Sequence, residues 1–485
     1  MRDETEAAGA AGTADVRRFG AAGDGETLDT AAIQAAVDGV SEGGGRVVLP
    51  PGTYLSGTLV LKSGVFLDLQ PGAVLQGSPR IEDYPEVGRE GHLDMRRRHL
   101  IYAEDARDCG IVGQGTIDGN GPAFWEPERS HEWAFWITRV DRPSPMLQFV
   151  NCRDLRIEGV TIRNSPGWTV HTLGCEHVRI TGITIRNGFF GPNNDGLDID
   201  GCRYVVVSDC DIETGDDAVV LKTTFLGGPT EYVTVSNCVL STSCSAFKLG
   251  SESHFDFRHI SLSNCVVPRS PRFVTIKTCD GGNIEDVFVG NMRGTTNSGW
   301  PVNRPIEIMA GVRKRIRPNT PAPAGAGRIS GVTLRDIDAV TDGRIFVMAE
   351  PGSVCERITL ANVRLRYAMI EDPSPLSPEG WLGDNAEAAA APAAMVADNI
   401  SELRVECFDV VWPEFPMREE WHVLHTENRL ANEGFYANRS ADEFIRGDHA
   451  VPFHVLWGRR LRKGCFMMDN VAGYKGADAE FMIPE

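Results

Sequence analysis

Short stretches in which apolar and polar residues alternate recur along most of this chain. Three of them, residues 152–162, 175–185 and 202–212, begin with cysteine and start 23 and then 27 residues apart. Similar stretches begin at Glu231, Arg258, Glu285, Ser330 and Glu356. Alternation with a period of two is typical of β-strands, whereas a helix would show a period of about 3.6 residues. The pattern therefore predicts an all-β solenoid in which each repeat contributes short strands.

A glycine, asparagine or aspartate interrupts each stretch near its middle. These residues are Gly159, Gly182, Asp209, Asn237, Asn264, Asn291, Asp336 and Asn362. They tolerate the left-handed backbone conformation that a sharp corner between two strands requires. Repeats built only of short strands fit a parallel β-helix whose coils stack about 4.8 Å apart. A leucine-rich horseshoe is disfavoured, because no helix-length segment follows each strand.

The two ends of the chain differ from the repeat. Residues 1–14 are rich in Ala, Gly and Glu and are expected to be disordered. Residues 29–38 combine an aspartate at the capping position with an apolar stripe, which predicts a helix that caps the first coil. Residues 15–411 are predicted to form the β-helix domain, with insertions near 294–327 and 367–398. Residues 412–485 lose the repeat and gain aromatic residues, so we expect a C-terminal cap.

The composition argues against several classes of protein. The chain has 485 residues and a formal net charge of −19, and it contains no basic run. Binding to nucleic acid or to an anionic membrane is therefore not expected, and no apolar stretch is long enough to span a membrane. The N-terminus lacks the basic and apolar regions of a signal peptide, which favours a cytoplasmic location. The sequence does not indicate an oligomeric state.

The 12 cysteines fit the repeat better than they fit a disulfide framework. Two registers of the repeat each hold three of them: Cys152, Cys175 and Cys202, and then Cys210, Cys238 and Cys265. Such ladders are expected to be inward-facing stacks of a small apolar side chain. Reduced, buried thiols are favoured over disulfides, and the absence of a Cys-x-x-Cys motif gives no support to a zinc site.

Three aspartates occupy corresponding places on successive repeats. Asp195 lies in Asn-Asn-Asp-Gly, and Asp216 and Asp217 lie in Gly-Asp-Asp, with 22 residues between Asp195 and Asp217. Residues one repeat apart stack in a solenoid, so these carboxylates are expected to converge. Crowded carboxylates push their pKa values apart, which can keep one acid protonated while another stays ionised. The alternative is that they are only turn residues, since aspartate favours turns.

The motifs around these aspartates resemble glycoside hydrolase family 28, which contains polygalacturonases and rhamnogalacturonan hydrolases. The resemblance covers about residues 15–365 and depends on the motifs at 164–171, 193–196 and 215–217, which include His171 and Asn193. It implies a right-handed parallel β-helix and hydrolysis with inversion at the anomeric carbon. It also implies that Asp216 is the general acid, while Asp195 and Asp217 position and deprotonate the attacking water.

The chain departs from the polygalacturonase pattern at two positions. Ser245 stands where those enzymes carry a histidine, and Thr275 stands where they carry an arginine, whereas Lys277 is retained. Polygalacturonase specificity is therefore in question, although the set of three carboxylates is complete. Rhamnogalacturonan-type members resemble this chain in lacking that histidine.

Lysines near the aspartates suggest attraction for an acidic sugar. The alternation places Asp198, Val220, Lys248 and Thr275 in one outward row, and Asp200, Lys222, Gly250 and Lys277 in the next. Lys222, Lys248 and Lys277 are then candidates for binding a carboxylate, and the alternative is that they pair with Asp198 and Asp200.

Further residues are weaker candidates for contact with substrate. Glu252 and His254 follow the Lys248 strand and are placed to touch a sugar, whereas His171 is more often a structural residue. A calcium site at Asp195, Asp198 and Asp200 is conceivable, because carboxylate oxygens suit Ca²⁺. The nearby lysines disfavour it, and we expect neither a metal nor a cofactor.

Three functional classes remain open from the sequence. The first is a hydrolase of uronic-acid- or rhamnose-containing oligosaccharides, expected to attack from a chain end. The second is a β-helix polysaccharide lyase, which the Gly-Asp-Asp motif and the lack of arginine at position 275 disfavour. The third is a carbohydrate-binding scaffold without catalysis, which the missing histidine favours.

Overall fold

A computed structural model describes residues 12–88, 97–129, 136–138, 141–296, 304–314, 320–341, 343–367, 393–411, 454–462, 464–467 and 471–472. Within them the chain is mostly β, and its strands pair in parallel with the strands of the next repeat, as the sequence predicts for a parallel β-helix. The chain forms two compact units. The first unit comprises Met1–Glu128, Trp136–Asp216 and Leu226–Cys238, and the second comprises Arg129–Phe135, Asp217–Phe225 and Val239–Glu485.

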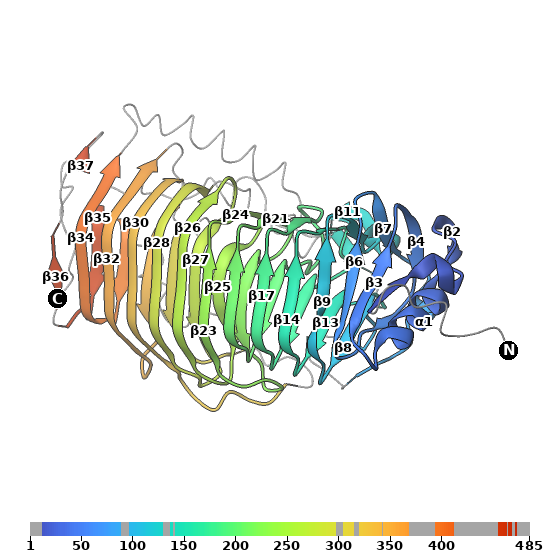
Figure 1. Cartoon of the computed structure of the whole chain (residues 1–485). Coiled ribbons are helices and arrows are strands. Elements are labelled where there is room, and N and C mark those ends of the chain that lie inside the picture. The colour runs from blue at the N-terminus through green and yellow to red at the C-terminus, as the bar shows by residue number, and fades with distance from the viewer. Residues whose placement is uncertain are drawn as a thin grey trace. The chain divides into compact units, whose positions relative to one another are not determined.

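Three parallel ladders make up the first unit (Figure 1). One runs through β1 (Thr13–Asp15), β3 (Gly45–Leu49), β6 (Val65–Leu69), β9 (Arg107–Gly113), β14 (Arg153–Glu158), β17 (Glu176–Thr181), β20 (Arg203–Ser208) and β23 (Thr230–Ser236). The second contains β2 (Asp24–Leu28), β4 (Gly52–Ser56), β7 (Ala73–Gly77), β10 (Thr116–Asp118), β15 (Thr161–Arg163), β18 (Thr184–Arg186) and β21 (Asp211–Thr214). The third contains β5 (Leu59–Val60), β8 (Ile101–Glu104), β13 (Leu147–Val150), β16 (Val170–Leu173) and β19 (Leu197–Asp200).

The remaining elements of the first unit lie near its N-terminal coils. Helix α1 (Thr30–Val40) buries Ile33, Ala36, Val37 and Val40 and contacts β1, β3 and β5, so the predicted helix is confirmed. Asp29 precedes it but does not cap it with its side chain. Its carboxylate instead accepts hydrogen bonds from the backbone N–H groups of Ala22 and Gly23. Short 3₁₀ turns occupy Val16–Phe19, Ile81–Asp83 and Gly121–Ala123, and β12 (Trp136–Thr138) pairs with β11 (Trp125–Arg129).

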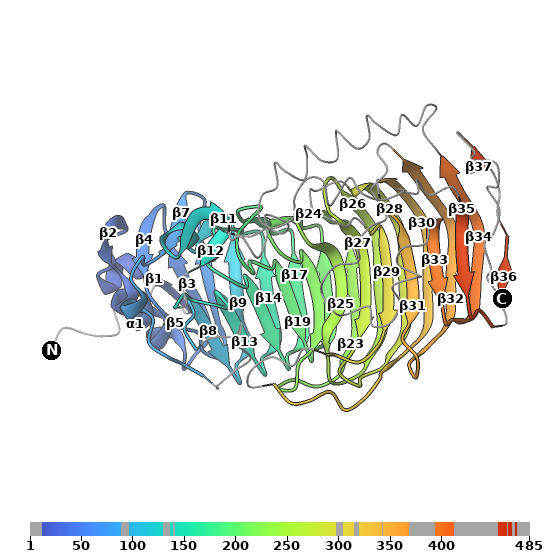
Figure 2. The ribbon, with the colours of Figure 1, turned by 180° about the vertical axis from the view of Figure 1, so that it is seen from behind.

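The second unit continues the same plan with longer strands, visible in Figure 2. One ladder contains β24 (Val239–Thr242), β26 (Phe257–Val267), β28 (Ile284–Thr296), β30 (Arg328–Thr341), β32 (Val354–Tyr367), β34 (Ser401–Val411), β36 (Cys465–Phe466) and β37 (Val471–Ala472). The other contains β22 (Val219–Thr223), β25 (Ser245–Ser253), β27 (Arg272–Thr278), β29 (Ile306–Ala310), β31 (Ile345–Ala349), β33 (Ala393–Asp398) and β35 (His454–Arg459).

Both predicted insertions are shorter in the structure than the ranges expected from the sequence. The range 294–327 contains β29 and the range 367–398 contains β33, and each of these strands pairs in register with the preceding coil. Added length is thus confined to the connections around these strands, and residues 368–392 lie outside the described residues. Of the predicted disordered segment, residues 1–11 also lie outside them, while Thr13 begins β1. Strand β35 extends the ladder into the region 412–485, most of which is likewise outside the described residues, so the cap stays a prediction.

The predicted corner residues all adopt the left-handed conformation. Their φ angles lie between 52° and 76° at Gly159, Gly182, Asp209, Asn237, Asn264, Asn291, Asp336 and Asn362. The first cysteine ladder also forms as expected, because the N–H of Cys152 lies 3.3 Å from Sγ of Cys175 and the N–H of Cys175 lies 3.3 Å from Sγ of Cys202. All three side chains are buried. Among the described helices, none is long and apolar enough to cross a membrane.

Candidate active site

In the first unit, two adjacent asparagines organise the acidic turns. Asn194 is fully buried, and its Oδ1 accepts a hydrogen bond of 2.6 Å from the N–H of Gly215. Asn193 adopts the left-handed conformation with φ of 49°, and its Nδ2 donates to Oδ2 of Asp216 over 3.3 Å. The turn that precedes β19 is thereby tied to the turn that carries Asp216. Asn193 contacts the carboxylate itself, in addition to its predicted role in substrate binding.

The two aspartates of the first unit differ in exposure. Asp195 is buried and its backbone carbonyl accepts a hydrogen bond from the N–H of Thr169, which fixes it to the preceding coil. Asp216 is partly exposed. Partial exposure and a hydrogen bond to an amide are compatible with transfer of a proton to a bound molecule.

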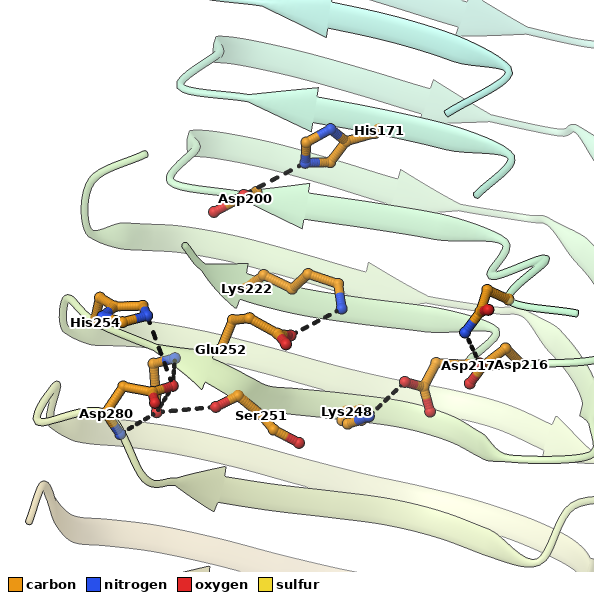
Figure 3. A network of polar contacts seen from close by, with 12 residues as sticks. His171, Asp200, Asp216, Asp217, Lys222, Lys248, Ser251, Glu252, His254 and Asp280 are labelled. Carbon is orange, nitrogen blue, oxygen red and sulfur yellow. Dashed lines mark hydrogen bonds and ion pairs between the residues drawn. The ribbon is translucent and has the colours of Figure 1, made fainter. Parts of the chain in front are cut away.

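His171 lies on the face of β16 that points away from the coil core, but it is fully buried. Its Nδ1 lies 2.8 Å from Oε1 of Gln148 and its Nε2 lies 3.4 Å from Oδ2 of Asp200. Figure 3 shows the pair formed with Asp200. These contacts of His171 are thus with other residues of the protein. Asp200, one of the three aspartates of the conceivable calcium site, contacts this histidine.

In the second unit, Asp217 is buried beside a lysine. Its Oδ2 lies 2.6 Å from Nζ of Lys248 (Figure 3), and its Oδ1 accepts a hydrogen bond of 3.1 Å from the N–H of Ser245. Burial alone would raise the pKa of Asp217, but the charges of Lys248 and Lys222 outweigh it and hold this pKa below its usual range. Asp217 is therefore an ionised carboxylate at neutral pH, suited to accept a proton or to hold a water molecule.

The predicted lysine rows are only partly correct. Val220, Lys248 and Thr275 are aligned as expected. The second row is not aligned as expected. The register between β22 and β25 shifts after Leu221, so Lys222 does not align with Gly250. Lys222 instead forms an ion pair of 3.2 Å with Glu252, and both side chains are almost completely buried (Figure 3). Lys248 pairs with Asp217, Lys222 with Glu252 and Lys277 with Glu307, so acids other than Asp198 and Asp200 also contact these lysines.

His254 lies at the edge of a second buried network. Its Nε2 is 4.0 Å from Oδ2 of Asp280, and the ring packs edge-on against Phe225. Asp280 also accepts hydrogen bonds from Arg313, which in addition donates to the backbone carbonyl of Ser251. This network holds the loop after β25, and Arg313 and Asp280 were not predicted from the sequence.

A third network surrounds Glu307, which the sequence also failed to indicate. Its buried carboxylate lies 3.2 Å from Nζ of Lys277 and 3.3 Å from Nε of Arg272, and it also binds Arg304. Burial alone would raise the pKa of Glu307, but these three cations hold it well below its usual range. Glu307 is aligned with Thr275 on the neighbouring strand. Its position inside a predicted insertion hid it, although the alternation Ile306, Glu307, Ile308 marks an outward-facing acid.

The two departures from the polygalacturonase pattern touch each other. Oγ of Ser245 and Oγ1 of Thr275 are 3.1 Å apart, and both residues are buried. The N–H of Ser245 binds Asp217, so this pair of hydroxyls lies directly beside the carboxylate. Positive charge next to Asp217 comes from Lys248, which does electrostatically what a bound cation would do.

The described residues thus combine a parallel β-helix with a partly exposed aspartate, Asp216, that is followed in the sequence by a buried and ionised aspartate, Asp217. Residues 69–375 match the model of the glycosyl hydrolases family 28, and the chain belongs to this family.

Known relatives agree with this assignment. A probable polygalacturonase from Vitis vinifera is 32% identical over 296 residues, which cover 56% of this chain and 59% of the relative. An exo-poly-alpha-D-galacturonosidase from Dickeya chrysanthemi is 29% identical over 248 residues, which cover 42% of this chain and 41% of the relative. The matches thus span about two fifths to three fifths of these curated relatives.

Solved structures show the same fold. The exopolygalacturonase from Thermotoga maritima superposes with a TM-score of 0.61 at 23% identity and covers 73% of this chain and 87% of that one. The family 28 exopolygalacturonase from Yersinia enterocolitica gives a TM-score of 0.62 at 20% identity, with 83% and 75% covered.

Proposed function

We propose that the protein hydrolyses glycosidic bonds in pectin-related oligosaccharides that contain uronic acid or rhamnose. The observation that carries the proposal is the contrast between Asp217 and Asp216. Lys248 and Lys222 keep the buried Asp217 ionised, whereas the partly exposed Asp216 accepts a hydrogen bond from an amide. Neighbouring carboxyl groups in different surroundings can serve as acid and base in one reaction.

The proposed reaction inverts the configuration at the anomeric carbon. Asp216 gives its proton to the leaving glycosidic oxygen as the bond from that oxygen to the anomeric carbon breaks. Asp195 and Asp217 orient a water molecule whose oxygen forms the new bond to that carbon, and one of them takes up the proton that the water releases. NMR of the first product formed from trigalacturonate should show the inverted anomer. Retention, or a trapped glycosyl-enzyme, would refute this mechanism.

We further propose that the enzyme attacks from a chain end. In the first unit, the outward residues Gln148, His171 and Asp198 of the third ladder are buried. Val87 and Leu226 pack against a neighbouring hydrophobic cluster on the same ladder. A long polymer lying along these strands would need an exposed row, so the burial favours a short substrate.

In the second unit the outward row is buried as well, except at the partly exposed Lys248. Beyond Lys248, Thr275 and Glu307, the aligned positions are Phe346, Val396 and Trp457, all buried in one hydrophobic cluster with Met309 and Met348. Curated relatives whose names indicate exo action, such as the one from Dickeya chrysanthemi, support this reading. Polygalacturonic acid should release monosaccharide with little loss of viscosity. A rapid fall in viscosity with mixed oligomers would mean attack within the chain.

The two other functional classes can be separated by simple assays. A lyase would produce an unsaturated, ultraviolet-absorbing product, whereas a hydrolase produces a new reducing end without such absorbance. A binding scaffold would retain oligosaccharide without releasing reducing ends from any member of a panel of pectin fragments. Reducing ends without unsaturated product are the result expected here.

A further inference from the structure

Arg142 is a buried cation in the first unit, and it has no part in the candidate site or in the proposed reaction described above. Its residue is 2% exposed, although it lies in a connection just before β13. One terminal nitrogen, Nη1, donates to the backbone carbonyls of Pro166 and Pro192 at 2.6 and 2.5 Å. The other, Nη2, lies 3.4 Å from Oδ1 of Asn193. Arg142 therefore holds two consecutive coils, including the turn that carries Asn193.

The contact with Arg142 determines which way the amide of Asn193 faces. A guanidinium group only donates hydrogen bonds, so it selects the carbonyl oxygen of the amide. Oδ1 of Asn193 consequently faces Arg142, and Nδ2 faces Oδ2 of Asp216, to which it donates over 3.3 Å. The dashed line at Asp216 in Figure 3 marks this second hydrogen bond.

The same logic extends to the carboxyl group of Asp216. Oδ2 of Asp216 accepts a hydrogen bond from the amide of Asn193. The proton of a neutral Asp216 is therefore placed on the other oxygen, Oδ1. We propose that Arg142 is a positioning residue which, through the amide of Asn193, fixes the carboxyl group of Asp216 with its proton on Oδ1 for transfer to the leaving oxygen. The inference rests on the proposed function of Asp216 as the general acid.

A role in folding alone would have different consequences. Arg142 shares the carbonyl of Pro166 with Nε1 of Trp125, which donates to it over 3.0 Å. If the arginine only held these loops together, its loss would weaken every activity equally. If it orients the acid, its loss should harm only reactions that need a proton on the leaving group.

The first experiment compares two substrates in the full-length protein. Arg142→Met should lower kcat on trigalacturonate by about 10²-fold, the effect of a small misplacement of a reacting group, with KM little changed. On 2,4-dinitrophenyl α-D-galacturonide, whose leaving group needs little protonation, kcat should fall by less than about threefold. Arg142→Lys keeps the charge but not the fork of donors and should recover only part of the loss.

A matched control is available on the next strand of the same unit. Arg153 forms an ion pair of 3.3 Å with Glu176 at the surface, so Arg153→Met should leave both rates unchanged. Equal losses by Arg142→Met on both substrates would overturn the proposal. A wild-type protein inactive on both substrates would instead overturn the proposed function.

A second experiment does not depend on activity. Unfolding equilibrium constants are measured in urea for Arg142→Met, Asn193→Ala and the double variant. Contacting residues should be non-additive by at least about threefold, whereas Arg153→Met combined with Asn193→Ala should be additive. Additivity of Arg142→Met and Asn193→Ala would remove the link from the arginine to Asp216, whatever the substrate. If Arg142→Met does not fold, Arg142→Lys replaces it in the same cycle.

Discussion

Removing the ammonium group of Lys248 should change both the stability and the pH dependence of the protein. Nζ of Lys248 lies 2.6 Å from the buried carboxylate of Asp217. At an effective dielectric constant of about 20, unit charges at this separation attract by roughly 6 kcal/mol. In Lys248→Met, Lys222 and the N–H of Ser245 still stabilise the carboxylate of Asp217. The free-energy cost of desolvating the ammonium group of Lys248 is also removed. A net loss of about 3 kcal/mol is therefore expected, near the lower end for breaking a buried pair.

The sign of the pH effect follows from the depressed pKa of Asp217. A carboxyl group whose pKa is lower in the folded state contributes stability above its unfolded pKa, and this contribution is lost as the pH falls through its folded pKa. In Lys248→Met the folded pKa of Asp217 rises, because the nearest positive charge that favours its ionised form is removed. If Asp217 must be ionised for the reaction, the acidic limb of the kcat profile should move to higher pH.

The measurements are urea unfolding at pH 7 and the pH profile of reducing-end release. Lys62→Met is the matched control, because Lys62 pairs with Asp38 at a similar distance of 2.8 Å, but both side chains are about half exposed. Such surface pairs contribute about 0–1 kcal/mol. If Lys248→Met lost no more stability than Lys62→Met and kept its acidic limb in place, the buried ion pair would not control Asp217.

Three further predictions concern other parts of the molecule. Asp216→Asn should lower kcat on trigalacturonate by at least about 10²-fold while binding persists, as titration calorimetry would show, and near-normal turnover would refute its role as acid. Glu307→Gln leaves the buried Arg304 and the two mostly buried cations Arg272 and Lys277 without their carboxylate and should cost about 3–5 kcal/mol in urea unfolding at pH 7. Because the folded pKa of Glu307 is depressed, the wild type should lose the stability contributed by this carboxylate on acidification. The difference in free energy of unfolding between wild type and variant should therefore become smaller at low pH, and a difference that stays constant would contradict this. Gly182→Ala should cost about 1 kcal/mol from backbone strain alone and lower Tm, because φ is 61° and no atom lies within 4 Å of the added methyl group; an unchanged Tm would contradict the strain.

The parts of the fold that follow local rules were predictable. The period-two alternation and the eight corner residues depend on backbone preferences of each repeat, and all eight corners have the expected conformation. A second set of left-handed residues was missed, including Tyr204 and Tyr232, because aromatic residues rarely adopt positive φ. Their rings stack on each other with centroids 5.1 Å apart, an interaction between coils that a single repeat does not reveal.

The residues of the candidate site could be proposed from the sequence, whereas several of their contacts could not. The carboxylates and lysines were found from spacing, whereas the partner of Lys222 depends on a register shift between two strands that alternation alone cannot indicate. The acids Glu307 and Asp280 were missed because they contribute through buried networks rather than through a motif. The proposed cytoplasmic location stays a prediction.

The long parallel ladder of the second unit has a mechanical consequence. Along β26, β28, β30, β32 and β34, each strand pairs with the strand of the coil before it and the coil after it. Val287 follows its partner Ile260 by 27 residues, so peeling one such coil from the stack frees about 95 Å of extended chain. When the two ends of this ladder are pulled apart with an optical trap, the extension should therefore increase in steps of one coil each, rather than in a single cooperative unfolding event.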